Sequence, residues 1–261
     1  MTNYSNSRIS MFEQCKYKYK LQYIDKVKVD IPNTIEAFMG DLVHKSLEKL
    51  YRNVSLGKTI DMKELLEYYH IKWKNLYSDK ILIAKKSYTA EDYKITGERF
   101  LIQYFNHYHP FNQMEIVGLE TEELMTLPDG NKYHVRIDKL ARIGTTYYIC
   151  DYKTNASMKT QDEADKDKQL AMYSIWVKDR HKDAEKVVLM WQMLAFNREL
   201  ISVRSDDELQ KLLDTTVKTI DIIEKTKDFP VKVTKLCDYC VYKSICIAFA
   251  KKDLNKLTSF F

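Results

Sequence analysis

Residues 132–153 read KYHVRIDKLARIGTTYYICDYK, and this stretch decides the fold. The runs at 132–141 and 146–152 contain β-branched and aromatic residues in the proportion that predicts two strands. Gly144 lies between the two runs and marks a turn. The stretch therefore predicts an antiparallel hairpin within a larger sheet.

Two acidic residues and a lysine lie on this hairpin. Side chains alternate between the faces of a strand, so Asp151 and Lys153 point the same way and Tyr152 points oppositely. The hairpin can bring Asp138 next to Asp151, and two adjacent carboxylates repel each other unless a cation lies between them. Such oxygen ligands favour Mg²⁺ or Mn²⁺, and a nearby lysine can stabilise charge on a phosphate. From these residues alone, a surface ion pair is an equally good interpretation.

The rest of the chain alternates between helical and strand patterns. Helices are predicted at 7–24 (with Ser7 as N-cap), 34–52, 61–109 with a break near 78–90, 162–180 and 206–226. Further strands are predicted at 114–121, 186–196 and 200–204. This order predicts an α/β fold with the core sequence α-β-β-β-α-β and one mixed sheet.

The composition excludes several classes of protein. The 261 residues carry 42 Lys+Arg and 37 Asp+Glu, a formal net charge of +5, which permits nucleic-acid binding without indicating it. No apolar run approaches the roughly 20 residues of a membrane-spanning helix, and the first residues lack the layout of a signal peptide. We therefore expect a soluble, cytoplasmic protein with no membrane partner, formed by a single domain over 1–261.

Two predicted helices carry polar residues at one-turn spacing. Gly40 and His44 share one helical face, and so do Gln169 and Tyr173. A glycine on such a face lets a ligand backbone approach closely. A lone histidine in an amphipathic helix is more often structural than a ligand, and a Gln/Tyr pair is usually a partly exposed face. Neither pair by itself indicates a site.

Taken in order, these motifs resemble the PD-(D/E)XK nuclease superfamily, specifically its RecB-like branch. The resemblance covers about residues 5–250. The matching segments are Gly40-Asp41-Leu42-Val43-His44 followed by Glu48, Asp138 in a strand, Asp151-Tyr152-Lys153-Thr154, and Gln169-Leu170-Ala171-Met172-Tyr173. The resemblance implies a restriction-endonuclease-like core with a helical insertion at about 53–113, and metal-dependent cleavage of DNA.

The resemblance also implies roles for individual residues. The implied ligands of the Mg²⁺ or Mn²⁺ ion are His44, Asp138, Asp151 and the main-chain carbonyl of Tyr152. Lys153 would orient or activate the attacking water. Gln169 and Tyr173 would hold DNA or the catalytic lysine.

Five cysteines are an odd number, and three of them lie close together near the C-terminus. Cys237, Cys240 and Cys246 have the spacing C-x2-C-x5-C, which indicates metal binding before disulfides in a cytosolic chain. A closed metal site normally needs a fourth ligand from elsewhere. Cys150 lies in a predicted strand and is expected to be a packed core thiol.

Residues 7–19 resemble the N-terminal part of AddB-type and CRISPR-adaptation nucleases of the same branch. Those proteins hold a 4Fe–4S cluster with one N-terminal cysteine and three C-terminal ones. The implied ligands here are Cys15, Cys237, Cys240 and Cys246. The cluster would be structural, in a clasp formed by residues 1–30 and 230–261. Zn²⁺ on the same cysteines is the alternative, because spacing alone does not exclude it.

The whole pattern predicts a metal-dependent deoxyribonuclease that hydrolyses phosphodiesters. Family analogy favours an exonuclease acting on DNA ends or single strands, in repair, recombination or CRISPR adaptation, with a helicase or integrase as partner. The alternative is a module with a nuclease fold that binds DNA or a helicase without cleaving.

Overall fold

The computed structural model describes residues 2–29 and 33–249, and the chain forms two compact units. One unit comprises residues 32–125 and 134–213, and the smaller unit comprises 1–31, 126–133 and 214–261. Among the described helices, none combines the length and apolar character needed to span a membrane.

The larger unit is built on a mixed sheet. Its strands are β2 (Glu115–Thr126), β3 (Lys132–Ile143), β4 (Thr146–Lys153), β5 (Lys186–Met193) and β6 (Arg198–Val203). β2 pairs with β3, β3 runs antiparallel to β4, β4 runs parallel to β5, and β5 runs antiparallel to β6. The parallel pair requires a crossover, which contains helix α7 (Lys168–Arg180). The predicted α/β fold, with a meander, a crossover and one mixed sheet, is confirmed.

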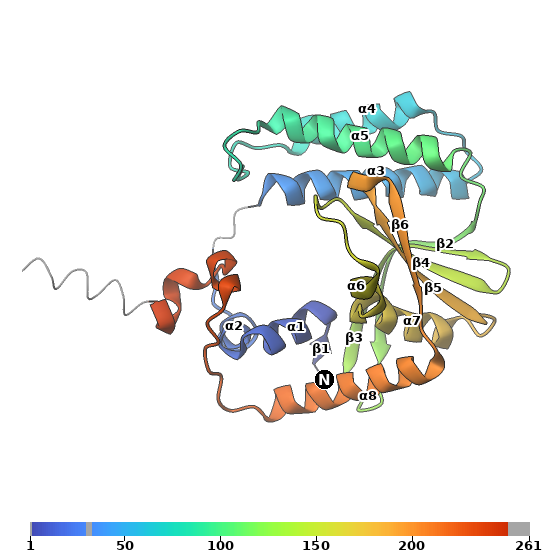
Figure 1. The fold of residues 1–261 in the computed structure, drawn as a ribbon. Helices are drawn as coiled ribbons and strands as arrows, with labels where there is room; N and C mark the ends of the chain where they lie inside the picture. Colours follow the sequence, from blue (N-terminus) through green and yellow to red (C-terminus); the bar gives the residue numbers. More distant parts are fainter. Residues whose placement is uncertain (1, 30–32, 250–261) are drawn as a thin grey trace, which may run out of the picture. The chain divides into compact units, whose positions relative to one another are not determined.

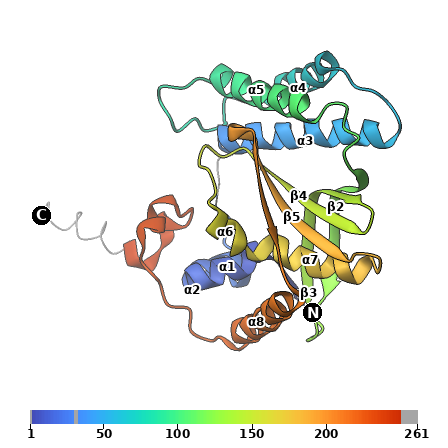
Figure 2. The ribbon, with the colours of Figure 1, turned by 45° about the vertical axis from the view of Figure 1, so that its right-hand side comes forward.

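Three helices pack together in the larger unit. They are α3 (Ile35–Ser55), α4 (Met62–Leu76) and α5 (Ala90–Tyr108), and Figures 1 and 2 show them lying together beside the strands. Their apolar faces share one buried core, to which Tyr152 of β4 contributes its ring. The predicted helix at 34–52 and the interrupted helical stretch at 61–109 are therefore confirmed.

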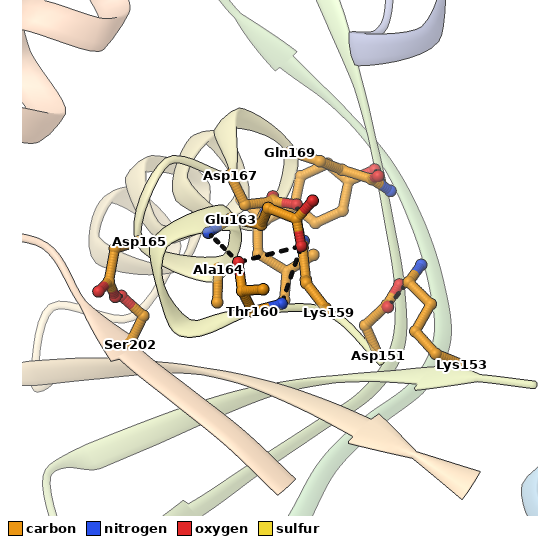
Figure 3. Close-up of polar contacts among 12 residues, drawn as sticks. Asp151, Lys153, Lys159, Thr160, Glu163, Ala164, Asp165, Asp167, Gln169 and Ser202 are labelled. Carbon is orange, nitrogen blue, oxygen red and sulfur yellow. Dashed lines mark hydrogen bonds and ion pairs between the residues drawn. The ribbon is translucent and has the colours of Figure 1, made fainter. Parts of the chain in front are cut away.

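The predicted helix at 162–180 is in fact two helices, α6 (Gln161–Asp165) and α7. Asp167 separates them: its backbone is extended, and its side chain accepts a hydrogen bond from a backbone N–H in the first turn of α7. Thr160 and Glu163 form a capping box at the start of α6 (Figure 3). A capping residue within a continuous helical pattern thus divides the predicted helix in two.

The smaller unit contains the N-terminal segment, and the single helix predicted at 7–24 is wrong there. Cys15 has an extended backbone (φ −158°), which divides the segment into α1 (Asn6–Gln14) and α2 (Lys16–Tyr19), with a π-helical turn after α2. Ser5, not the predicted Ser7, caps α1, because its side chain accepts a hydrogen bond from a backbone N–H of the first turn.

Other parts of the chain join the N-terminal segment in this unit. β1 (Asn3–Tyr4), which the sequence did not indicate, pairs in parallel with Lys132 and Tyr133, the first two residues of β3, which belong to this smaller unit. The C-terminal part of α8 (Asp206–Lys225) contacts β1, since the hydroxyl of Tyr4 donates to Glu224. Two short 3-10 turns, Lys235–Tyr239 and Lys243–Ile245, carry the three clustered cysteines or lie beside them. The parts of the predicted clasp at 1, 30 and 250–261 lie outside the described residues.

Candidate active site

The hairpin of β3 and β4 brings the two predicted acids together. Lys139 pairs with Cys150 in the antiparallel register, which places Asp138 across from Asp151 one position further along. The backbone N–H of Tyr152 donates a 2.9 Å hydrogen bond to Oδ2 of Asp138. This bond fixes the first carboxylate against the strand that carries the second.

Asp151 and Lys153 form an ion pair on β4. Oδ2 of Asp151 lies 2.6 Å from Nζ of Lys153, and Figure 3 shows the two side chains lying together. The side chain of Asp151 is 14% exposed and that of Lys153 is 37% exposed, so the pair lies at the edge of solvent. Tyr152, between them in sequence, is buried in the core of α3, α4 and α5, as strand alternation predicts.

His44 reaches this pair of strands from α3. Its Nδ1 lies 3.4 Å from Oδ2 of Asp138, and its ring packs edge-on against Tyr152 at a centroid distance of 5.5 Å. Gly40, one turn earlier, has a packing role, because a Cβ there would lie 2.8 Å from Oγ1 of Thr154. The glycine therefore lets the segment after β4 approach the helix.

His44 and Asp138 each stabilise the charged form of the other. Burial disfavours the imidazolium, but the hydrogen bond and charge of Asp138 outweigh it and raise the pKa of His44 above its ordinary value. Burial likewise disfavours the carboxylate, but His44 and the N–H of Tyr152 hold the pKa of Asp138 below its usual range. Asp138 is therefore ionised at neutral pH.

Asp151 is the acid of the site whose ionised form is disfavoured by its surroundings. Its pKa is raised to about 6: burial is the largest cause, Lys153 opposes the rise, and the charge of Asp138 adds to it. Burial lowers the pKa of Lys153, but Asp151 outweighs burial and the net pKa is raised. At pH 7 to 8 the site thus holds two carboxylates and one ammonium group. A divalent cation among these oxygens would relieve their repulsion, so the donor set fits Mg²⁺ or Mn²⁺.

Sequence reasoning missed two residues of the site, Glu120 and Arg136. A ligand atom of Glu120, one of His44 and one of Asp138 all lie within 4.8 Å of one another. Arg136 donates to Glu120, with Nη2 at 3.3 Å from Oε2. The sequence did contain a signal, since Glu120 lies near the end of the strand predicted at 114–121, which is the strand that precedes the hairpin. It could not be used without knowing how β2 pairs with β3.

Gln169 and Tyr173 meet on α7 as their spacing predicts. Nε2 of Gln169 donates to the hydroxyl of Tyr173 at 3.2 Å. Burial raises the pKa of Tyr173, while hydrogen bonds from Gln169 and the backbone of Arg136 oppose that rise. Figure 3 shows Gln169 across from the Asp151–Lys153 pair. Both residues therefore lie at the site, through contacts with each other and with β3.

Two open hollows lie beside the site. One has a volume of about 280 Å³, and its lining includes Gly40, His44, Glu48, Glu120, Arg136 and Thr154. The other has a volume of about 470 Å³, and its lining includes Lys153, Asn155, Ser157, Met158, Lys159 and Met193. His44 and Glu120 thus face one open space and Lys153 faces the other.

The four cysteines of the predicted cluster line one small cavity within the smaller unit. The ligand candidates are Cys15, Cys237, Cys240 and Cys246. All five cysteines are among the described residues, and they form no disulfide. Cys150 is fully buried in β4, and burial raises the pKa of its thiol to about 11, which agrees with the predicted core thiol.

Comparison with known proteins identifies the family. The model of the PD-(D/E)XK nuclease superfamily matches residues 3–247, and the chain belongs to this superfamily. A solved structure described as "Crystal structure of SSO0001" is similar at 19% identity, over 90% of this chain and 95% of that chain, with a TM-score of 0.37. Among curated proteins, none matches the chain. The predicted superfamily is confirmed.

Proposed function

We propose that the chain hydrolyses DNA phosphodiesters with a divalent metal ion. The observation that carries this proposal is the Asp151–Lys153 pair at 2.6 Å, on the strand next to the His44–Asp138 pair at 3.4 Å. Membership of a superfamily of metal-dependent nucleases supports the same chemistry. A surface ion pair does not account for two acids that are only 12% and 14% exposed beside a histidine, because removing two neighbouring carboxylates from water is costly.

The proposed metal ligands are His44, Asp138, Asp151 and the carbonyl of Tyr152. A bound Mg²⁺ or Mn²⁺ supplies positive charge to the phosphate and lowers the pKa of a bound water. The Tyr152 N–H holds Asp138 in place in the metal-free protein, so the position of this ligand is already ordered before metal binds. Asp151 has a pKa of about 6 and is ionised at pH 7 to 8, as a metal ligand must be.

Lys153 acts as a charged group in this proposal. Its pKa is raised by Asp151, so it holds its proton at neutral pH and cannot accept one from water. Its role is to orient the attacking water by a hydrogen bond and to stabilise the charge that grows on the phosphate. The hollow of about 470 Å³ beside it gives the substrate access to the ammonium group.

Gln169 and Tyr173 are proposed to hold the DNA or to position Lys153. Their mutual hydrogen bond and the contact of Tyr173 with the backbone of Arg136 keep both side chains beside the acids. Their groups are neutral donors and acceptors, which suit a phosphate oxygen or an ammonium group equally.

We further propose that the substrate is a DNA end or single strand, and that the chain belongs to the RecB-like branch. The motif order supports the branch, and the open hollows on both sides of the site support a strand that passes across it. A role in repair, recombination or CRISPR adaptation, with a helicase or integrase partner, follows from that branch alone.

A metal cluster on Cys15, Cys237, Cys240 and Cys246 is proposed for the smaller unit. The four thiols line one cavity, and such a donor set suits either a 4Fe–4S cluster or Zn²⁺.

The test is cleavage of end-labelled single- and double-stranded linear DNA with Mn²⁺ or Mg²⁺, beside Asp151→Ala. We expect metal-dependent cleavage that falls by at least about 10³-fold in the variant, with an unchanged circular dichroism spectrum. The order of the products gives the polarity. Mn²⁺ binding and DNA binding without cleavage by metal-loaded protein would contradict a nuclease and leave a binding module.

A further inference from the structure

Glu120 is an acid placed at the metal site by β2. Its ligand atom lies within 4.8 Å of one on His44 and one on Asp138. An ion with bonds of about 2.1 Å holds neighbouring octahedral ligands about 3 Å apart and opposite ligands about 4.2 Å apart. The three side chains are therefore spaced as ligands of one ion require, with only small movements.

The environment of Glu120 differs from that of other acids on the strand. The side chain of Glu120 is 25% exposed, whereas that of Glu122 is 69% exposed and pairs with His134. Glu120 also lines the hollow of about 280 Å³ together with His44. Glu120 thus faces the site and Glu122 faces solvent, although they are two residues apart on one strand.

The backbone of Glu120 has a conformation that favours glycine. Its φ is +44°, in the left-handed region, within β2. A side chain there costs about 1 kcal/mol or more relative to glycine. Left-handed residues of this kind occur at β-bulges, which turn a side chain away from its regular direction. The conformation aims the carboxylate at His44 and Asp138.

The carboxylates of Glu120 and Asp138 lie close together beside His44. Arg136 lies 3.3 Å from Glu120, but its side chain is 64% exposed, so water screens its charge. Two carboxylates that face each other beside an imidazole are relieved by a divalent ion.

We propose that Glu120 is a metal ligand that completes a divalent-cation site with His44 and Asp138. The proposal rests on the metal-dependent nuclease proposed above and adds a ligand that the family motifs did not supply. Glu120 is added to the ligands of the ion proposed above, which are His44, Asp138, Asp151 and the carbonyl of Tyr152.

The test is a Mn²⁺ titration of the DNA-free protein, with unbound Mn²⁺ followed by electron paramagnetic resonance. Mn²⁺ is a suitable probe because it prefers carboxylates to thiolates. We expect Glu120→Gln to raise the Kd for Mn²⁺ by at least about tenfold, and Glu120→Asp to recover part of the loss. Glu122→Gln is the matched control and should bind as the wild type does.

Glu120→Gly separates a ligand from a structural residue. Glycine accepts the left-handed backbone, so this variant should unfold in EDTA at the wild-type temperature or above, and still bind Mn²⁺ as weakly as Glu120→Gln. Wild-type Mn²⁺ affinity in Glu120→Gln or Glu120→Gly would overturn the proposal. Loss of cleavage in Asp151→Ala would stand independently of that result, so the two proposals can fail separately.

Discussion

The acidic site and the cysteine cavity both gather metal-binding side chains, but they are held in different ways. Strand pairing and short contacts fix the acids: Tyr152 N–H binds Asp138, and His44 packs against both. The cysteines lie on and beside two short 3-10 turns, where Tyr239 is 86% exposed. The acidic site is thus ordered by the protein, whereas the cysteine region has little apolar burial, and we expect its stability to depend on the proposed metal.

The largest expected difference is the response to loss of a metal ligand in each region. Cys240→Ser should remove at least half of the bound iron or zinc and lower the melting temperature by several degrees, because the ends of the unit lose their link. Asp151→Ala should leave the metal at the cysteines and should not lower the melting temperature.

Elemental analysis, the visible spectrum and calorimetry measure these effects. Cys150→Ala is the matched control, because this cysteine lies in the core and should retain the metal. A Cys240→Ser protein that is colourless yet melts like the wild type would show that the cysteine region does not need its cluster.

A smaller effect concerns pH and the acidic site alone. In the metal-free protein the pKa of Asp151 is about 6, against an ordinary value of 3.8, so the folded state binds the proton more tightly than the unfolded state. This acid therefore contributes stability that is fully present below about pH 4 and is lost as pH rises through about 6. Above pH 6 the difference corresponds to about 3 kcal/mol as an upper bound.

Asp151→Asn removes this titration, so it should raise the free energy of unfolding at pH 8 by about 1 to 3 kcal/mol and have little effect at pH 4. Urea unfolding in EDTA measures it. Asp179→Asn, which changes an exposed acid far from the site residues in sequence, is the control. An equal change at both pH values would mean that the carboxylate charge is not what destabilises the site.

The smallest expected effect concerns the stability that comes from packing α3 against the segment after β4. Gly40→Ala gains about 1 kcal/mol in helix propensity but places a Cβ 2.8 Å from Oγ1 of Thr154, so we expect a net loss of about 1 kcal/mol. In a Thr154→Ala background the same substitution should stabilise by about 1 kcal/mol. A double-mutant cycle measures the coupling. Additive effects would show that the helix and the strand end do not touch there.

Much of the fold was predictable because it depends on local patterns. The strands around Asp138 and Asp151 follow from alternation and a glycine turn, and the helix with His44 follows from its apolar periodicity. The errors lie where a cap overrides the periodicity: Asp167 divides one helix, and Cys15 divides another. A polar or extended residue at such a break looks ordinary in a periodic pattern.

The site was predictable to the extent that its residues follow one another in motifs. Asp151 and Lys153 share a face because a strand repeats every two residues, and the structure pairs them at 2.6 Å. Glu120 was missed because its importance comes from the pairing of β2 with β3 and from a left-handed backbone. Neither the strand pairing nor the backbone conformation can be recognised from the amino-acid sequence alone.

The sequence by itself therefore determined the order of elements, the superfamily and the acid–lysine spacing, since each depends on near neighbours in the chain. Only the tertiary structure decided that His44 of α3 meets Asp138 of β3, that Gly40 makes room for Thr154, and that Glu120 joins them. The physical reason is that these contacts join separate elements, whose approach is set by packing and strand register.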